Sequence, residues 1–159
     1  MSAQTVYSFS TPIGQAGGIY DLAPYEVNTF INAANDGVMK FGMGVVSGTK
    51  AGTEIKVGSG DFEGIVTNRR TNENGIFGGV EIRKGVALGV MRWGKIYGLL
   101  AANVEPAYGD KVYLVTSGDD AGCFTNTSTD NKEIAGVFEG TACEGIALIK
   151  LFNQAQPSA

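Results

Sequence analysis

The stretch that decides the fold is GVALGVMRWGKIYGLL, residues 85–100. Its first half places Val86, Leu88 and Val90 at every second position, which is the period of a β-strand that turns one face to a core. The rest of the stretch is also largely apolar. The pattern therefore predicts β structure in the middle of the sequence.

Strand-sized segments separated by turn signals lie on both sides of this stretch. Residues 53–57 and 80–83 alternate apolar and polar side chains, so each is expected to bury one face. Residues 112–115 and 146–152 are nearly continuous apolar runs, which are typical of strands covered on both sides. Glycine supplies 24 of the 159 residues, about twice its usual share, and tight turns and bulges explain this excess. With roughly seven to ten short strands, the sequence predicts an all-β fold, a small barrel or a sandwich.

The composition describes a chain that folds but lacks the side chains of common catalytic sites. Hydrophobic residues make up 43% and charged residues 18%, which allows a buried core. No histidine is present, which excludes catalytic triads, Cys-His pairs and histidine-based zinc sites. Cys123 and Cys143 lack a CxxC spacing, and we expect two buried thiols. The sequence predicts no metal and no cofactor.

Patterns that resemble catalytic motifs are each incomplete. Residues 89–96 follow the spacing of a phosphate-binding loop, but Ile96 stands where a serine or threonine hydroxyl must hold magnesium. Asp61 with Glu63, and Glu139 with Glu144, could form carboxylate pairs, yet their simpler interpretation is surface charge. We therefore expect no enzyme.

The charge is unevenly distributed along the chain. The net charge is −4, and no apolar stretch or signal-like N-terminus indicates a membrane or secretion, so we expect a soluble, cytosol-made protein that binds neither nucleic acid nor membrane. Residues 69–95, however, hold six bases and two acids. This window is either a solvated rim or a contact for an acidic neighbour, which could be another copy. Its candidate interface cations are Arg69, Arg70, Arg83, Lys84, Arg92 and Lys95.

The first 40 residues differ from the rest, because prolines and glycines interrupt regular structure while apolar side chains recur. We expect an extended arm over residues 1–40, a barrel body over 41–153 and a flexible tail over 154–159. Residues 27–34 match a helical stripe but are rich in β-branched side chains, so a short helix and an irregular segment both stay open. An apolar arm needs its own barrel or another chain to cover it. The candidate contact residues are Val6, Tyr7, Phe9, Ile13, Ile19, Tyr20, Leu22 and Tyr25.

The order of segments resembles a known family. The relevant stretches are FGMGVVSGT (41–49), KGVALGV (84–90), WGKIY (93–97), YGDKVYL (108–114), IAGV (134–137) and GIALIKL (145–151). Together they resemble the structural cement, or capsid decoration, proteins of tailed bacteriophages. The resemblance covers about residues 12–153 and carries no catalytic motif.

The resemblance implies a β-rich homotrimer without catalytic residues. Such a protein is assembled in the host bacterial cytoplasm and sits on the outer surface of the virion. There it binds the major capsid protein and ties neighbouring subunits together against the pressure of packaged DNA. The alternatives are a tail-tube or head-completion protein and a carbohydrate-binding module for host attachment.

Overall fold

The computed structural model describes residues 14–21, 23–68 and 81–153. This part of the chain holds nine strands and no helix, which confirms the all-β prediction. The strands are β1 (Glu26–Asn32), β2 (Gly44–Ser47), β3 (Glu54–Lys56), β4 (Phe62–Val66), β5 (Ala87–Leu99), β6 (Lys111–Leu114), β7 (Phe124–Thr125), β8 (Lys132–Phe138) and β9 (Ile146–Leu151).

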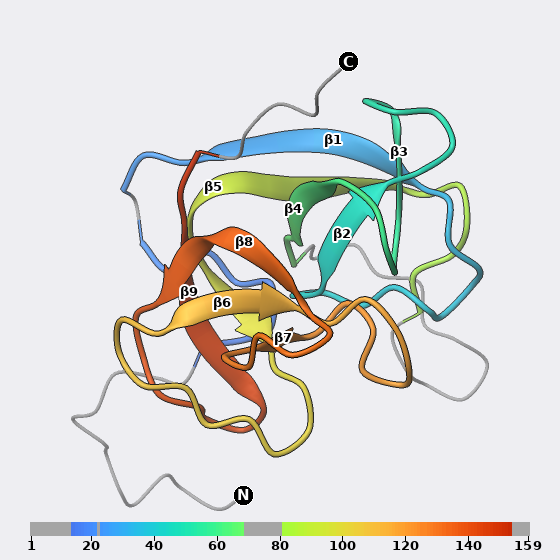
Figure 1. Cartoon of the computed structure of the whole chain (residues 1–159). Coiled ribbons are helices and arrows are strands. Elements are labelled where there is room, and N and C mark those ends of the chain that lie inside the picture. Colours follow the sequence, from blue (N-terminus) through green and yellow to red (C-terminus); the bar gives the residue numbers. More distant parts are fainter. Residues whose placement is uncertain (1–13, 22, 69–80, 154–159) are drawn as a thin grey trace, which may run out of the picture.

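The first five strands form a closed barrel in the order β1, β3, β2, β4, β5 (Figure 1). Closure comes from β5, which also pairs with β1 in an antiparallel register that places Phe30 opposite Leu88. The pairing of β1 with β3 is parallel. Along one edge β5 pairs with β1 over its length, whereas β3 pairs on the other edge only with Ile31 and Asn32.

Strand β5 also belongs to a second sheet. Its 13 residues extend beyond the barrel, and the section from Gly94 to Leu99 pairs with β9. The sheet continues through β8, β6 and β7, and a bridge between Leu100 and Phe124 brings β7 back to the end of β5. The predicted central strand is thus the element that joins both halves of the fold (Figure 1).

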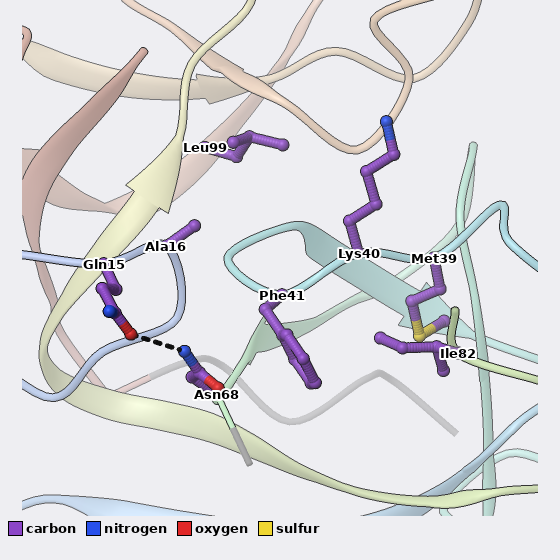
Figure 2. A pocket seen from close by; sticks show the side chains of 8 residues that line it. All are labelled: Gln15, Ala16, Met39, Lys40, Phe41, Asn68, Ile82 and Leu99. Carbon is purple, nitrogen blue, oxygen red and sulfur yellow. Dashed lines mark hydrogen bonds between the residues drawn. The ribbon is translucent and has the colours of Figure 1, made fainter. Parts of the chain in front are cut away.

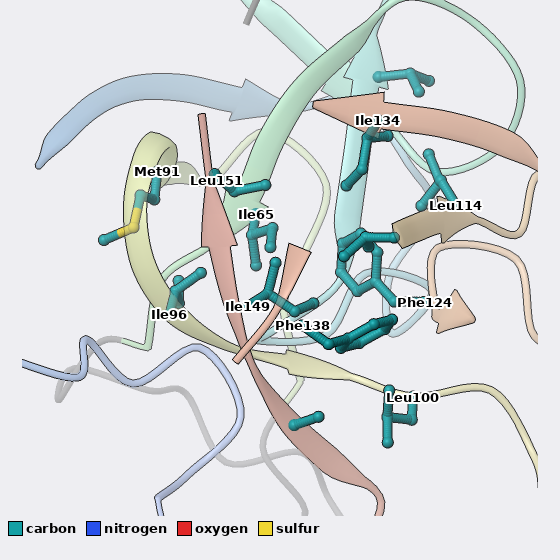
Figure 3. Packing of buried hydrophobic residues seen from close by; sticks show 13 residues of the cluster. Ile65, Met91, Ile96, Leu100, Leu114, Phe124, Ile134, Phe138, Ile149 and Leu151 are labelled. Carbon is teal, nitrogen blue, oxygen red and sulfur yellow. The ribbon is translucent and has the colours of Figure 1, made fainter. Parts of the chain in front are cut away.

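Two hydrophobic clusters lie on opposite sides of β2, β4 and β5. Because side chains alternate along a strand, neighbouring residues enter different clusters. The cluster inside the barrel contains Phe30, Met39, Val45, Ile55, Val66, Ile82, Leu88 and Val90. The larger cluster lies between the barrel and the second sheet and includes Val46, Ile65, Met91, Ile96, Phe124, Phe138 and Ile149 (Figure 3). The two layers together hold the fold in place.

The structure corrects the sequence prediction for residues 27–34, because Glu26–Asn32 is strand β1 and not a short helix. Phe30 and Asn32 point inward and are buried, whereas Val27 and Ile31 point outward and are exposed. The β-branched residues that disfavour a helix suit a strand, and β5 supplies the hydrogen-bonding partner. The sheet therefore begins within the segment expected to be an arm.

Two further strand predictions need correction. Residues 81–83 form no strand, and residue 80 lies outside the described residues. The runs at 112–115 and 146–152 do contain strands β6 and β9, but Tyr113 and Leu148 are only partly buried and Lys150 is exposed. These strands are thus not covered on both sides. That arrangement belongs to β2, β4 and β5, which lie between the two clusters.

Candidate interaction surfaces

The segment at residues 17–20 lies along the edge of the second half of β5. Gly17 N donates to Tyr97 O at 2.8 Å, Tyr97 N donates to Gly18 O at 3.0 Å, and Tyr20 N donates to Lys95 O at 3.2 Å. Ile19 forms a β-bridge with Ile96. This part of the expected arm therefore packs on its own barrel and covers a strand edge that otherwise invites pairing with another chain.

Side chains reinforce this attachment. The Tyr20 ring stands edge-on to the Tyr97 ring, with 6.1 Å between centroids. Lys95 Nζ lies 5.8 Å from the centroid of the Tyr20 ring and 3.2 Å from Glu139 Oε2. The hydrogen bond to Glu139 raises the pKa of Lys95, and burial raises the pKa of Tyr97. We call Tyr20, Lys95, Tyr97 and Glu139 the arm-base cluster.

The chain crosses Tyr97 at Gly14. A Cβ atom at residue 14 would lie 2.2 Å from Tyr97 Cε2, so a larger residue here would have to displace the Tyr97 ring. Two hollows border this part of the chain. One, of about 280 Å³, is lined by Gly14, Tyr20, Tyr97, Glu139, Gly140, Thr141, Cys143, Ile146, Ala147 and Leu148. We call it the Tyr97 hollow.

The second hollow measures about 350 Å³ and is shown in Figure 2. Met39 and Ile82 lie side by side on one wall, and Asn68 Nδ2 donates to Gln15 Oε1 at 3.3 Å on the opposite side (Figure 2). Lys40 stands at the same hollow. Both hollows thus border the segment that enters the barrel from the N-terminal side.

The outward side of β1 forms the second candidate surface. Val27 and Ile31 are 37% and 39% exposed, whereas Phe30 between them is 4% exposed. In the register with β5, Thr29 lies opposite Gly89 and Ile31 opposite Ala87. We call Val27, Thr29, Ile31 and Ala87 the β1 outer face. Because its side chains are short or apolar, it offers a neighbour a flat contact area.

Two cations lie at one end of the β1 outer face. Buried Asn32 donates through Nδ2 to the Arg83 carbonyl at 3.0 Å and accepts from Gly85 N at 2.8 Å through its own carbonyl. Asp36 accepts from Lys84 N at 2.7 Å. These bonds hold the turn that carries the exposed Arg83 and Lys84. Charge and apolar area are therefore adjacent.

The structure places the other predicted cations differently. Arg92 is turned inward, and its Nη1 lies 2.5 Å from Glu63 Oε2, with side chains 12% and 4% exposed. Ser47 Oγ donates to the other Glu63 oxygen. Arg92 is thus largely covered and paired within its own chain. Lys95 belongs to the arm-base cluster, and Arg69 and Arg70 lie outside the described residues.

Of the predicted apolar contacts, Ile19, Tyr20 and Tyr25 are 40%, 46% and 44% exposed. They are partly covered by the barrel and still offer apolar area. The remaining predicted contacts, Val6, Tyr7, Phe9, Ile13 and Leu22, lie outside the described residues. Sequence reasoning missed Val27 and Ile31 as surface residues, although their spacing with polar Thr29 between them is that of one strand face.

The cysteines and carboxylates considered as candidate catalytic or metal-binding residues form no such site in the part of the chain that the structure describes. Cys123 is a free thiol whose pKa is raised by burial, and Cys143 is a free, exposed thiol, so the expectation of two buried thiols is wrong for Cys143. Glu139 is paired with Lys95. Among the residues that the structure describes, no three His, Cys, Asp or Glu side chains are placed to hold a metal. In the same residues, no helix has the length and apolar character to cross a membrane.

These features define a small all-β protein with exposed apolar surfaces on a closed barrel. The chain matches the structural cement protein family (E217 gp24/Pam3 gp6) over residues 3–152, and it belongs to that family. Its role is therefore structural, in the decoration of a phage capsid. This confirms the sequence interpretation that the chain is a capsid decoration protein.

A solved structure supports the fold. The chain resembles a protein in "The capsid of Myoviridae Phage XM1" with a TM-score of 0.70 and 17% identity, covering 98% of this chain and 100% of that chain. At this identity the likeness shows the fold alone. No curated protein matches the sequence.

Proposed function

We propose that this protein binds the outer surface of a tailed-phage head as a homotrimer and ties neighbouring major capsid protein subunits together. The observation that carries the proposal is the β1 outer face, where apolar side chains are exposed along a strand that β5 pairs over its length. The contact therefore uses side chains, with the N-terminal arm adding further apolar area. The protein acts without catalysis, nucleic acid or membrane.

The energetics fit a cement. Apolar burial contributes about 25 cal/mol per Å², so a few hundred Å² contributes several kcal/mol before the cost of association. Val27, Ile31 and the partly exposed Ile19, Tyr20 and Tyr25 supply such area. On a symmetric shell the same contact repeats many times, so modest affinities combine to resist internal pressure.

The charges favour a particular kind of partner surface. Lys84 lies next to the apolar β1 outer face, so a capsid surface with an acidic side chain beside an apolar strip complements it. Such exposed pairs add modestly to affinity but help to fix orientation. Binding should accordingly weaken as ionic strength rises.

The experiment is co-sedimentation of purified variants with heads that lack the protein. Ile31→Glu should weaken binding at least about tenfold, or 1.4 kcal/mol, because it places a charge in the apolar contact. Tyr108→Glu is the matched control, since Tyr108 is 77% exposed and lies in the loop before β6. A variant that lacks residues 2–13 tests the arm and leaves the hydrogen bonds of residues 17–20 intact.

Equal binding by Ile31→Glu and Tyr108→Glu would remove the β1 outer face from the mechanism. Undiminished binding of the shortened chain would remove residues 2–13. The mass of the purified protein in solution tests the trimer, and a monomer would contradict it. Increased rupture of undecorated heads under osmotic shock is the expected sign of stabilisation.

A further inference from the structure

We propose that the Tyr97 hollow binds one neutral sugar ring. This inference goes beyond the proposed function, because tying capsid subunits together requires no small ligand. It is tested on the isolated protein, so its outcome is independent of capsid binding.

The hollow offers a ligand several hydrogen-bonding groups. Three side chains of its lining carry hydroxyls, namely Tyr20, Tyr97 and Thr141. Within the part of the chain that the structure describes, none of these hydroxyls takes part in a hydrogen bond. The backbone N–H groups of Gly140 and Thr141 also have no acceptor there. A ligand in the hollow can therefore accept from these groups, and the hydroxyls can accept in return.

The charge at the hollow favours a neutral ligand. Among the described residues that line it, Glu139 alone is charged, and its carboxylate lies 3.2 Å from Lys95 Nζ. Because this pair is neutral overall, neither an anion nor a cation finds a free counter-charge. The carboxylate still has acceptor capacity, since it can accept about four hydrogen bonds. A sugar hydroxyl both donates and accepts, so this mixture of groups suits it.

Apolar surface lies beside the polar groups. Tyr20 is 46% exposed and stands edge-on to Tyr97, and Ala147 and Leu148 also line the hollow. The faces of a sugar ring carry C–H groups, which pack against the electron-rich face of an aromatic ring. A volume of about 280 Å³ is near the lower limit of about 300 Å³ for small-molecule pockets. One sugar ring therefore occupies the hollow, and the rest of a glycan stays outside.

A site for a single ring binds weakly, and we expect a dissociation constant of about 1–10 mM. Copies repeated on a capsid shell combine such contacts, so that a decorated head adheres to a glycan-covered surface. This consequence rests on the proposed function, whereas the site itself rests on the hollow alone.

Titration of the isotope-labelled full chain with methyl glycosides of glucose, galactose, mannose and N-acetylglucosamine tests the site by nuclear magnetic resonance. At least one glycoside should shift the amide signals of Gly140 and Thr141 in a saturable manner. Thr141→Val should weaken this binding at least about fivefold, because it removes a hydroxyl that bonds the ligand. Thr129→Val is the matched control, since Thr129 is exposed in the loop before β8, and it should leave the affinity unchanged.

Cys143 gives a second readout on the unmodified protein, because it is exposed, free and lines the hollow. At about ten times its dissociation constant, the best-binding glycoside should slow maleimide modification of Cys143 at least about fivefold, while buried Cys123 stays unreactive. The absence of a saturable shift with all four glycosides would overturn the proposal. Shifts confined to other parts of the chain, equal weakening by the two threonine variants, or an unchanged modification rate would do the same.

Discussion

Replacing Arg92 by methionine tests whether this residue supports the fold or the capsid contact. Its guanidinium lies 2.5 Å from the Glu63 carboxylate, and the two side chains are 12% and 4% exposed. Methionine keeps much of the aliphatic volume and removes the charge. The variant therefore leaves Glu63 as a buried carboxylate whose remaining hydrogen-bond partner is Ser47.

The expected loss of stability follows from this burial. Two unit charges about 4 Å apart attract by about 4 kcal/mol at an effective dielectric constant of 20, and removing both from water costs several kcal/mol per ion. The intact pair therefore contributes little net stability. Breaking it removes the attraction and keeps the desolvation cost of Glu63, so Arg92→Met should lower the free energy of unfolding by about 3–5 kcal/mol.

Urea unfolding followed by the fluorescence of the single tryptophan measures this loss, at one protein concentration so that self-association does not contribute. The double variant Glu63→Gln, Arg92→Met should recover at least about half of it, because no unpaired charge stays buried. Lys111→Met is the matched control: its pair with Glu133 is 67% and 56% exposed, so the loss should be under about 1 kcal/mol. If Arg92→Met also loses less than about 1 kcal/mol of stability, or if the double variant recovers none of the loss, the argument is refuted. Weakened head binding by the fully folded variant would return Arg92 to the interface.

Other substitutions test the fold locally. Gly64→Ala should lower the free energy of unfolding by about 2–4 kcal/mol, because φ of Gly64 is +155° and the added Cβ would lie 2.2 Å from Met91 O. Gly140→Ala is the control and should change the free energy of unfolding by less than about 0.5 kcal/mol, because its Cβ would meet no atom nearer than 3.8 Å. Equal melting temperatures of the two variants would contradict the prediction. Hydrogen bonds from a backbone N–H and from Asn126 lower the pKa of Asp110, so its contribution to stability is present above the ordinary aspartate value and is lost as pH falls through the lower folded value. Asp110→Asn should therefore flatten the acid side of the stability profile below about pH 4, and unchanged slopes in urea titrations would count against it.

The strands that the sequence predicts well are those whose pattern is local. Alternation in residues 53–57 and 85–100 corresponds to β3 and β5, and the apolar runs correspond to β6 and β9. A strand between two cores is apolar on both faces, and this holds for β2 and β4 as well as β5. Their double burial depends on which strands pair, and that information lies in contacts between distant residues.

The same limit explains the errors at the candidate surfaces. Arg92 reads as one cation among six in its window, and only the pairing of β4 with β5 brings it to Glu63. Likewise, residues 17–20 cover an edge of the second half of β5. This edge exists because β5 extends beyond the barrel. Composition indicates that such groups are available for contact, but topology decides whether they face a core, their own chain or a neighbour.

Strand β1 shows how a wrong prediction can carry information about function. Its helical spacing arises because Val27 and Ile31 lie on one face and Phe30 on the other, so two apolar faces together imitate a period near 3.6. A strand in a small barrel needs only its inner face to be apolar, since water covers the outer one. Apolar residues on the outer face of β1 are therefore not required by the barrel core, which is why we propose them as contacts for a neighbour.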